Sequence, residues 1–186
     1  KDLKEMGRTD IILKTDGEPA LVAAQEAIQA RRPGRTIPQN PLAYNPESNG
    51  ACEKAVQDVG AQTRALKIGL ESRLREPISD NSPIVEWMIP HAAYLLTRFQ
   101  VGHDGMAPFE RLTGRKWRRP LVEFGEVVFA KLALKKVAKG SKKRQKRKMA
   151  PRAVLGVWVG QIGRTGEHIV IKQSGDTIRC RTIRRV

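Results

Sequence analysis

The chain has 186 residues, 5% of them aromatic and 29% charged, with a formal net charge of +16. This length supports one domain with a real core, or one domain and a small appended module. No apolar run approaches the ~20 residues that a membrane-spanning helix needs. Cys52 and Cys180 lie far apart in the sequence, and neither is separated from a histidine by the short interval that is typical of zinc ligands. A membrane span and a zinc site are therefore not expected, and two isolated thiols fit a reducing compartment.

The charge is unevenly distributed along the chain. Residues 1–110 hold 13 Lys and Arg against 15 Asp and Glu, whereas residues 111–186 hold 22 against 4. A near-neutral first part and a strongly basic second part indicate a core with an appended region that binds a polyanion. A solvated basic tail or a ribosomal-type protein is the alternative.

The first part of the chain alternates between strand-like and helical patterns. The β-branched run at 10–14 predicts a buried strand, and the apolar spacing at 20–31 predicts a helix. A brief strand is expected at 36–38. Residues 39–50 then form a loop, because prolines forbid a regular helix there. A long helix at 51–74 completes a βαβα unit, which favours α/β architecture.

The second part begins with a helix at 84–99, in which Pro90 predicts a kink or a split. A short helix at 106–114 ends at Gly114, and residues 126–131 are strand-like. From 153 to 186 three short strands are separated by glycine-containing turns, which is typical of a small antiparallel sheet or barrel.

Two acidic residues are predicted at a strand end and a helix start, where functional side chains often lie. Asp16 follows the first predicted strand, so it lies at the sheet edge where α/β proteins bind ligands. It could equally be a turn aspartate that bonds its own backbone. Glu53 lies in the first turn of the long helix, where an acid also simply favours the helix dipole.

The long helix carries cations on the same face as Glu53. Gly60, Arg64 and Lys67 follow Glu53 at helical spacing, so a groove at Gly60 beside two cations could admit a nucleic-acid backbone. From its charge and position, Lys54 is also expected to bind nucleic acid.

Four segments together resemble the integrases of retroviruses and LTR retrotransposons. Y-N-P-E-S-N-G at 44–50, followed by Glu53, resembles the family's loop and catalytic helix, and T-D-G at 15–17 resembles the segment of its second catalytic aspartate. Thirty-six residues separate Asp16 from Glu53, close to the spacing of the D,D-35-E motif. Residues 107–115 and 151–160 are similar, in the same order, to two later segments of copia-type elements.

This resemblance implies an α/β fold: a truncated RNase H-like core, with a mixed sheet and flanking helices, followed by a basic linker and a small SH3-like β module. Asp16 and Glu53 would be catalytic and would bind Mg²⁺ (or Mn²⁺), since hard cations prefer carboxylate oxygens. Tyr44, Ser48 and Asn49 match loop positions that contact DNA ends. The implied activity is a polynucleotidyl transferase that inserts element DNA into target DNA.

The resemblance also implies a homo-oligomer in the full-length protein. It places the protein in the nucleus, reached through a virus-like particle or the cytoplasm. The expected domains are a catalytic part at 1–115, a connector and basic linker at 116–152, and the β module at 153–186.

The sequence departs from the family in three places. Asp16 is followed directly by Gly17, and Val56 and Gly60 stand where retroviral enzymes have Asn and Lys, which puts recognition of the DNA ends in doubt. The family's first aspartate and its zinc module have no counterpart, because only 15 residues precede Asp16. We therefore expect a polyprotein fragment that is inactive alone and has an exposed sheet edge.

The basic half is expected to hold nucleic acid without reading its bases. Trp158 lies in an alternating strand and is expected in the core rather than on a stacking surface. The dense run of cations could be a DNA clamp, a nuclear-import signal or a solvated linker. Its predicted nucleic-acid-binding residues are Lys142, Lys143, Arg144, Lys146, Arg147 and Lys148.

Two other functions remain open from the residues. The first is a non-catalytic nucleic-acid-binding protein derived from a decayed or domesticated element. The second is a ribonuclease H or other nuclease of the same fold, in which water rather than a DNA hydroxyl is the nucleophile.

Overall fold

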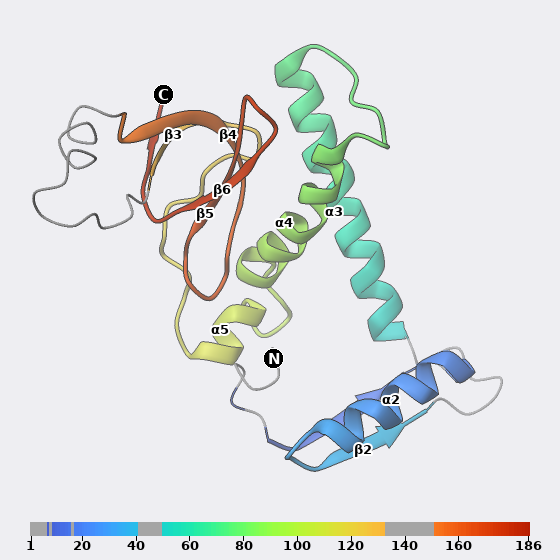
Figure 1. Ribbon diagram of the computed structural model, residues 1–186. Coiled ribbons are helices and arrows are strands. Elements are labelled where there is room, and N and C mark those ends of the chain that lie inside the picture. Colours follow the sequence, from blue (N-terminus) through green and yellow to red (C-terminus); the bar gives the residue numbers. More distant parts are fainter. Residues whose placement is uncertain (1–6, 8, 16, 41–49, 133–150) are drawn as a thin grey trace, which may run out of the picture. The chain divides into compact units, whose positions relative to one another are not determined.

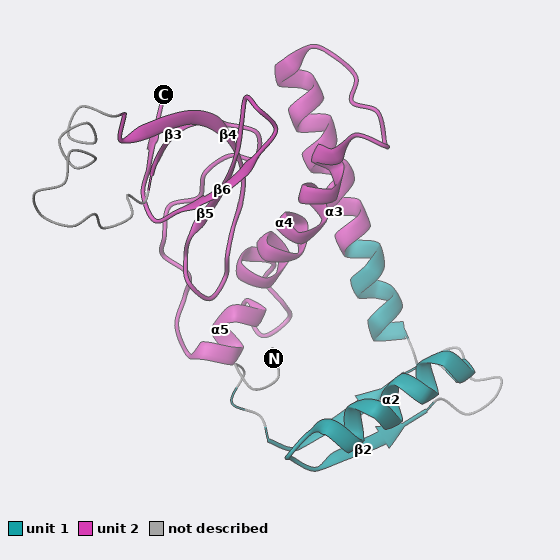
Figure 2. Ribbon diagram, in the orientation of Figure 1, with its two compact units in different colours: residues 1–58 teal, residues 59–186 magenta. Residues whose placement is uncertain are grey.

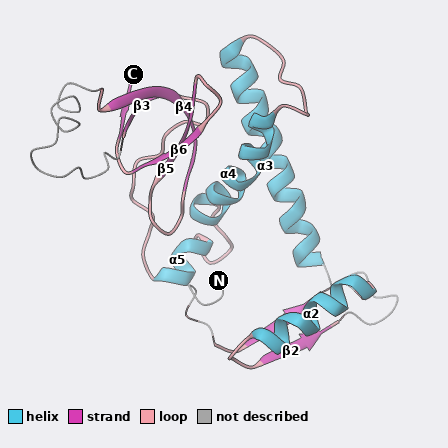
Figure 3. Ribbon diagram, viewed as in Figure 1, coloured by secondary structure: helices cyan, strands magenta, loops and turns pink. Residues whose placement is uncertain are grey.

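The computed structural model describes residues 7, 9–15, 17–40, 50–132 and 151–186 (Figure 1). The chain divides into two units, residues 1–58 and residues 59–186 (Figure 2). Helices and strands both occur in each unit, so the protein is of mixed α/β type, in agreement with the expected class (Figure 3).

The first unit contains a parallel pair of strands joined by a helix. Strand β1 (Ile11–Lys14) pairs with β2 (Thr36–Gln39), and α2 (Pro19–Arg31) forms the crossover between them. A parallel pair needs such a crossover, whereas antiparallel strands can be joined by a tight turn. The predicted strand–helix–strand order is therefore confirmed.

The packing of this unit differs from the expectation. Leu21 and Ile28 belong to the apolar spacing that predicted α2, but they are 42% and 40% exposed. The buried residue of α2 is Gln25, whose Nε2 donates a hydrogen bond to the Leu13 carbonyl over 2.6 Å. Ile12 is 64% exposed, and Ile11 and Leu13 are only half-buried, so the prediction of a buried first strand is wrong. A single helix covers only one face of a two-stranded sheet.

Helix α3 (Gly50–Leu74) begins in the first unit and ends in the second. It matches the predicted helix to within one residue. The apolar side chains of this helix are buried only near its end, where Leu70 is 3% exposed, while Val56 near its start is 73% exposed. Burial therefore follows the packing partners available to each turn rather than the apolar pattern alone.

Two further helices follow in the second unit. Helix α4 (Pro83–Phe99) runs through Pro90 without a split. Helix α5 (Pro108–Thr113) ends at Gly114, whose φ of +70° lies in the left-handed region that favours glycine. The predicted end of the short helix is thus confirmed.

The rest of the second unit is a five-stranded antiparallel sheet in the order β6-β5-β4-β3-β7. Its strands are β3 (Val127–Lys131), β4 (Ala153–Gln161), β5 (His168–Lys172), β6 (Thr177–Cys180) and β7 (Ile183–Arg185). We predicted three strands after residue 153, and the third of them is divided into β6 and β7. Strand β3, from the segment assigned to the connector, pairs with both β4 and β7.

Two apolar clusters hold the second unit together. Trp158, only 1% exposed, packs with Val128, Ala130 and Val170 on the inner face of the sheet, which confirms its expected place in the core. The second cluster joins the sheet to α3 and α4, which lie beside it in Figure 1. Its buried members are Leu70, Met88, Phe124 and Val159.

Candidate functional site

The first candidate site lies at the edge where β1 and β2 end. The Thr15 amide donates to the Gln39 carbonyl over 3.4 Å, and the Thr15 hydroxyl donates to Asn40 Oδ1 over 3.0 Å. Two segments therefore leave this edge side by side. One leads directly to Asp16, and the other leads through residues 41–49 to α3 and Glu53.

Of the two predicted metal-binding carboxylates, Glu53 lies within the described residues. Glu53 lies in the first turn of α3 with an exposed side chain, a position that also favours the helix dipole. Asp16, Tyr44, Ser48 and Asn49 lie outside the described residues.

The metal expected from the resemblance needs carboxylate oxygens. Among the residues that the structure describes, no three His, Cys, Asp or Glu side chains gather as a possible metal site. Asp16 is not in that set, so the predicted ligand pair stays a prediction. Glu53 has the hard oxygen donors that Mg²⁺ and Mn²⁺ prefer.

Two predicted cations of α3 differ in their surroundings. Lys54 Nζ lies 2.7 Å from Asp58 Oδ1, one turn further along the helix. Arg64 is exposed, and its Nη1 lies 3.6 Å from where a Cβ atom on Gly60 would stand. Arg64 therefore covers Gly60, as expected for residues on one helix face.

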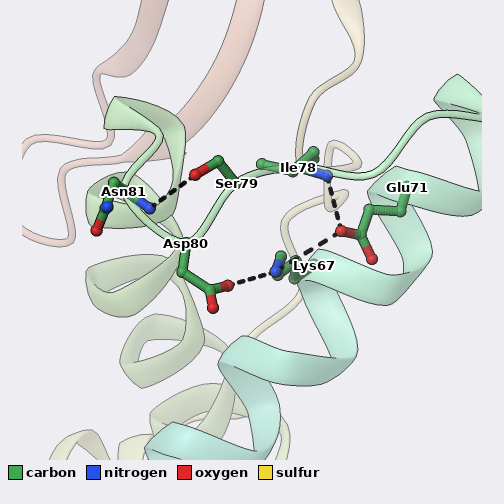
Figure 4. A network of polar contacts seen from close by, with 6 residues as sticks. All are labelled: Lys67, Glu71, Ile78, Ser79, Asp80 and Asn81. Carbon is green, nitrogen blue, oxygen red and sulfur yellow. Dashed lines mark hydrogen bonds and ion pairs between the residues drawn. The ribbon is translucent and has the colours of Figure 1, made fainter.

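Lys67 takes part in a network that ties α3 to the segment before α4 (Figure 4). Its ammonium group pairs with Asp80 and lies 3.7 Å from Glu71, whose Oε1 accepts a hydrogen bond from the Ile78 amide over 2.8 Å. The bond to Asp80 raises the pKa of Lys67, and Lys67 lowers the pKa of Asp80. A phosphate would have to compete with Asp80 for this lysine.

Another cation, Arg98, has a structural role. Its guanidinium lies 3.6 Å from the centroid of the Tyr94 ring, 4.7 Å from that of Trp117 and 5.6 Å from that of Phe109. Tyr94 also donates from its hydroxyl to Gln161 Oε1 over 2.9 Å. Arg98 therefore joins α4, α5 and the segment after α5 by cation–π contacts, and Tyr94 joins α4 to β4.

A second candidate site lies on the outer face of the sheet, in the part of the chain expected to bind nucleic acid, but at residues that the sequence did not single out. A cavity of about 430 Å³ opens beside Phe129, and three cations but no carboxylate line it. We call it the basic sheet groove. Its residues are Phe129, Lys131, Arg152, Ala153, Thr182, Ile183 and Arg184.

The groove had only a weak signal in the sequence. Residues 126–131 carry apolar side chains on both faces of the predicted strand, so the pattern does not say which face is buried. Val128 and Ala130 turn inward and pack with Trp158 in the core. Phe129 is therefore left on the outer face.

The other predicted nucleic-acid ligands, Lys142, Lys143, Arg144, Lys146, Arg147 and Lys148, lie outside the described residues. Among the described residues, no helix is long and apolar enough to cross a membrane.

No protein-family model matches this chain, and no curated protein matches it. Among solved structures, it is similar to a chain in the cryo-EM structure of the simian T-cell lymphotropic virus intasome in complex with PP2A regulatory subunit B56 gamma. The identity is 14% and the TM-score 0.41, over the whole of this chain and 60% of that one. A TM-score this low does not define a shared fold.

Proposed function

We propose that this chain acts in DNA integration, as part of a polynucleotidyl transferase that joins element DNA ends to target DNA. The observation that carries the proposal is the common edge at which β1 and β2 end. Thr15 immediately precedes Asp16 and is bonded to Gln39 and Asn40, which begin the segment leading to Glu53. Two motif-bearing segments that start from one sheet edge favour a shared site.

In this proposal Asp16 and Glu53 hold the divalent metal, Mg²⁺ or Mn²⁺. When bound, such ions stabilise the charge that develops on the attacking and leaving oxygens in phosphodiester chemistry. The chain's own contribution is to present two carboxylates from a strand end and a helix start. An exposed Glu53 suits this role because the DNA must reach it from solvent.

In this proposal the cations bind the phosphates of DNA. Lys54, Arg64 and Lys67 lie along α3, and the run from Lys142 to Lys148 adds six charges. Contacts of this kind neutralise phosphates and carry no sequence information. The proposal therefore includes element ends and target DNA as partners, a homo-oligomer of the full-length protein, and action in the nucleus.

The test is strand transfer by the longest protein that contains this chain, with Mg²⁺ and labelled DNA ends. Asp16→Asn and Glu53→Gln should each abolish transfer and weaken Mn²⁺ binding, while DNA affinity stays at the level of the parent protein. Glu18→Gln is the matched control, because Glu18 is an exposed acid close to Asp16 in the chain. Transfer at the parent rate by either site variant would refute the assignment.

A further inference from the structure

The outer face of the five-stranded sheet is covered over only part of its area. Val157, Ile169 and Ile171 pack into the cluster that contains Leu70 of α3 and Met88 of α4. Further along the same strands this covering ends. There the sheet carries apolar side chains that no described helix of the second unit covers.

The bare part is centred on Phe129 of β3. Phe129 is 43% exposed and stands opposite Leu155 of β4, which is 48% exposed. On its other side it stands opposite Arg184 of β7. An aromatic ring thus has an aliphatic neighbour on one strand and a guanidinium on the next.

The cations of the basic sheet groove are available for a ligand. Lys131, Arg152 and Arg184 are exposed, and none of them forms an ion pair with a carboxylate among the described residues. Other cations of the same sheet are engaged. Lys172 pairs with Asp176 over 2.5 Å, and Arg185 pairs with Glu126. Three cations without an ion-pair partner among the described residues therefore line the groove beside Phe129.

We propose that the basic sheet groove binds unpaired nucleotides of a single-stranded nucleic acid, with a base on the Phe129 ring and neighbouring phosphates on the three cations. Exposed aromatic rings inside a cationic groove are the usual means of binding single strands, because every base has a flat apolar face. The inference deepens the proposed function and rests on it for the class of ligand. It adds that the basic sheet groove binds single-stranded DNA in preference to duplex DNA.

Two other occupants fit the groove less well. A second copy of the chain in a twofold contact would bring the same cations against one another, which is unfavourable. An acidic amphipathic helix needs a long apolar groove, whereas a cavity of about 430 Å³ has the size of a small-ligand pocket. A nucleotide matches both the size and the charge.

The experiment measures binding of the full chain to a fluorescein-labelled oligothymidylate of roughly ten nucleotides and to a duplex of the same length. Because the run from Lys142 to Lys148 would attract either form, the readout is the ratio of the two dissociation constants. Phe129→Ala and Phe129→Leu should each weaken single-strand binding about tenfold and leave duplex binding unchanged. Phe129→Trp should retain single-strand binding.

Phe99→Ala is the matched control, because Phe99 of α4 is 44% exposed and lies outside the groove. It should leave the ratio unchanged. Arg184→Gln should lower the slope of log affinity against log salt for the single strand by about 0.7, whereas Arg115→Gln, an exposed arginine after α5, should not produce this groove-specific loss. Thermal unfolding of each variant shows whether it is folded.

Single-strand binding by Phe129→Leu equal to that of the parent chain would overturn the proposal. So would concentration-dependent dimerisation without DNA that Phe129→Ala abolishes, since the groove would then be a contact between copies. Failure of the proposed function looks different. In that case Glu53→Gln retains strand transfer, while the effect of Phe129→Ala on the binding ratio persists.

Discussion

The indole Nε1 of Trp158 donates a hydrogen bond to Nδ1 of His168 over 3.0 Å, from β4 to the neighbouring strand β5. Indole nitrogen is only a donor, so Nδ1 must be the unprotonated acceptor and the neutral ring carries its proton on Nε2. Burial also lowers the pKa of His168, which favours this neutral form. The largest side chain of the core thereby has its single polar atom satisfied.

Removing either partner of this bond should destabilise the second unit. His168→Phe leaves the buried indole N–H without an acceptor and should cost about 2 kcal/mol of unfolding free energy. Trp158→Phe loses the donor and some packing volume and should cost a similar amount. In a double-mutant cycle by urea unfolding, the two losses should be less than additive by about 1 kcal/mol. Additive losses would show that the bond does not contribute.

His91 should make the stability of the chain sensitive to acid. It is 3% exposed among the rings of Phe124 and Trp158, and burial lowers its pKa from 6.5 to about 4. Between these values the unfolded state binds a proton that the folded state does not. The unfolding free energy should therefore fall as the pH decreases from about 6.5 to about 4, by up to about 3 kcal/mol.

Urea unfolding at a series of pH values tests this linkage. His91→Phe should remove the part of the decrease in unfolding free energy that is due to His91. The difference between this variant and the parent chain separates the effect of His91 from that of carboxylates, which titrate at lower pH. His103→Gln is the control, because His103 is exposed. A parent-like pH profile in His91→Phe would assign the acid sensitivity to other groups.

Asp80→Asn should reveal whether Lys67 can bind DNA. The substitution removes the stronger of the two anionic partners of Lys67 and leaves Glu71. If Lys67 contacts a phosphate, DNA affinity should rise and the log–log salt slope should steepen by about 0.9. Asp176→Asn, which releases Lys172 of β5 in the same way, is the control. Unchanged affinity in Asp80→Asn would leave Lys67 with a purely structural role.

The basic run should dominate the salt dependence of duplex binding if it is a DNA clamp. Replacing its six cations with Gln removes up to six phosphate contacts and should flatten the slope by up to about 5. Fluorescence anisotropy at several salt concentrations measures this slope. A solvated linker or an import signal predicts little change, and the import signal predicts loss of nuclear accumulation of a fluorescent fusion instead.

Much of the element order could be predicted because each element has a local cause. Pro19 begins α2, Gly114 ends α5, and β-branched residues mark β1. Burial is a tertiary property and could not be predicted in the same way. Leu21 belongs to an apolar stripe but remains exposed, since the described part of the first unit offers no second layer to cover it.

The two candidate sites differ in the same way, because one follows from a local sequence pattern and the other depends on tertiary packing. Glu53 is predicted from a motif, and it lies in the first turn of α3. Phe129 has no motif, and its exposure depends on the choice between two apolar faces of β3. The inward face of β3 packs with Trp158, 29 residues further along the chain, and a local pattern does not register such a contact.

Ile12 and Ile37 stand opposite each other on β1 and β2, 64% and 42% exposed. Among the described residues, β1 and β2 pair only with each other, and an aliphatic pair beside such a strand edge is a template on which another chain can add a strand. The net charge of +16 keeps molecules apart at low ionic strength, but at ~1 M salt the Debye length shrinks to about 3 Å and this repulsion is screened. Colloidal stability of concentrated solutions should therefore decrease with salt, with self-association beginning at this pair.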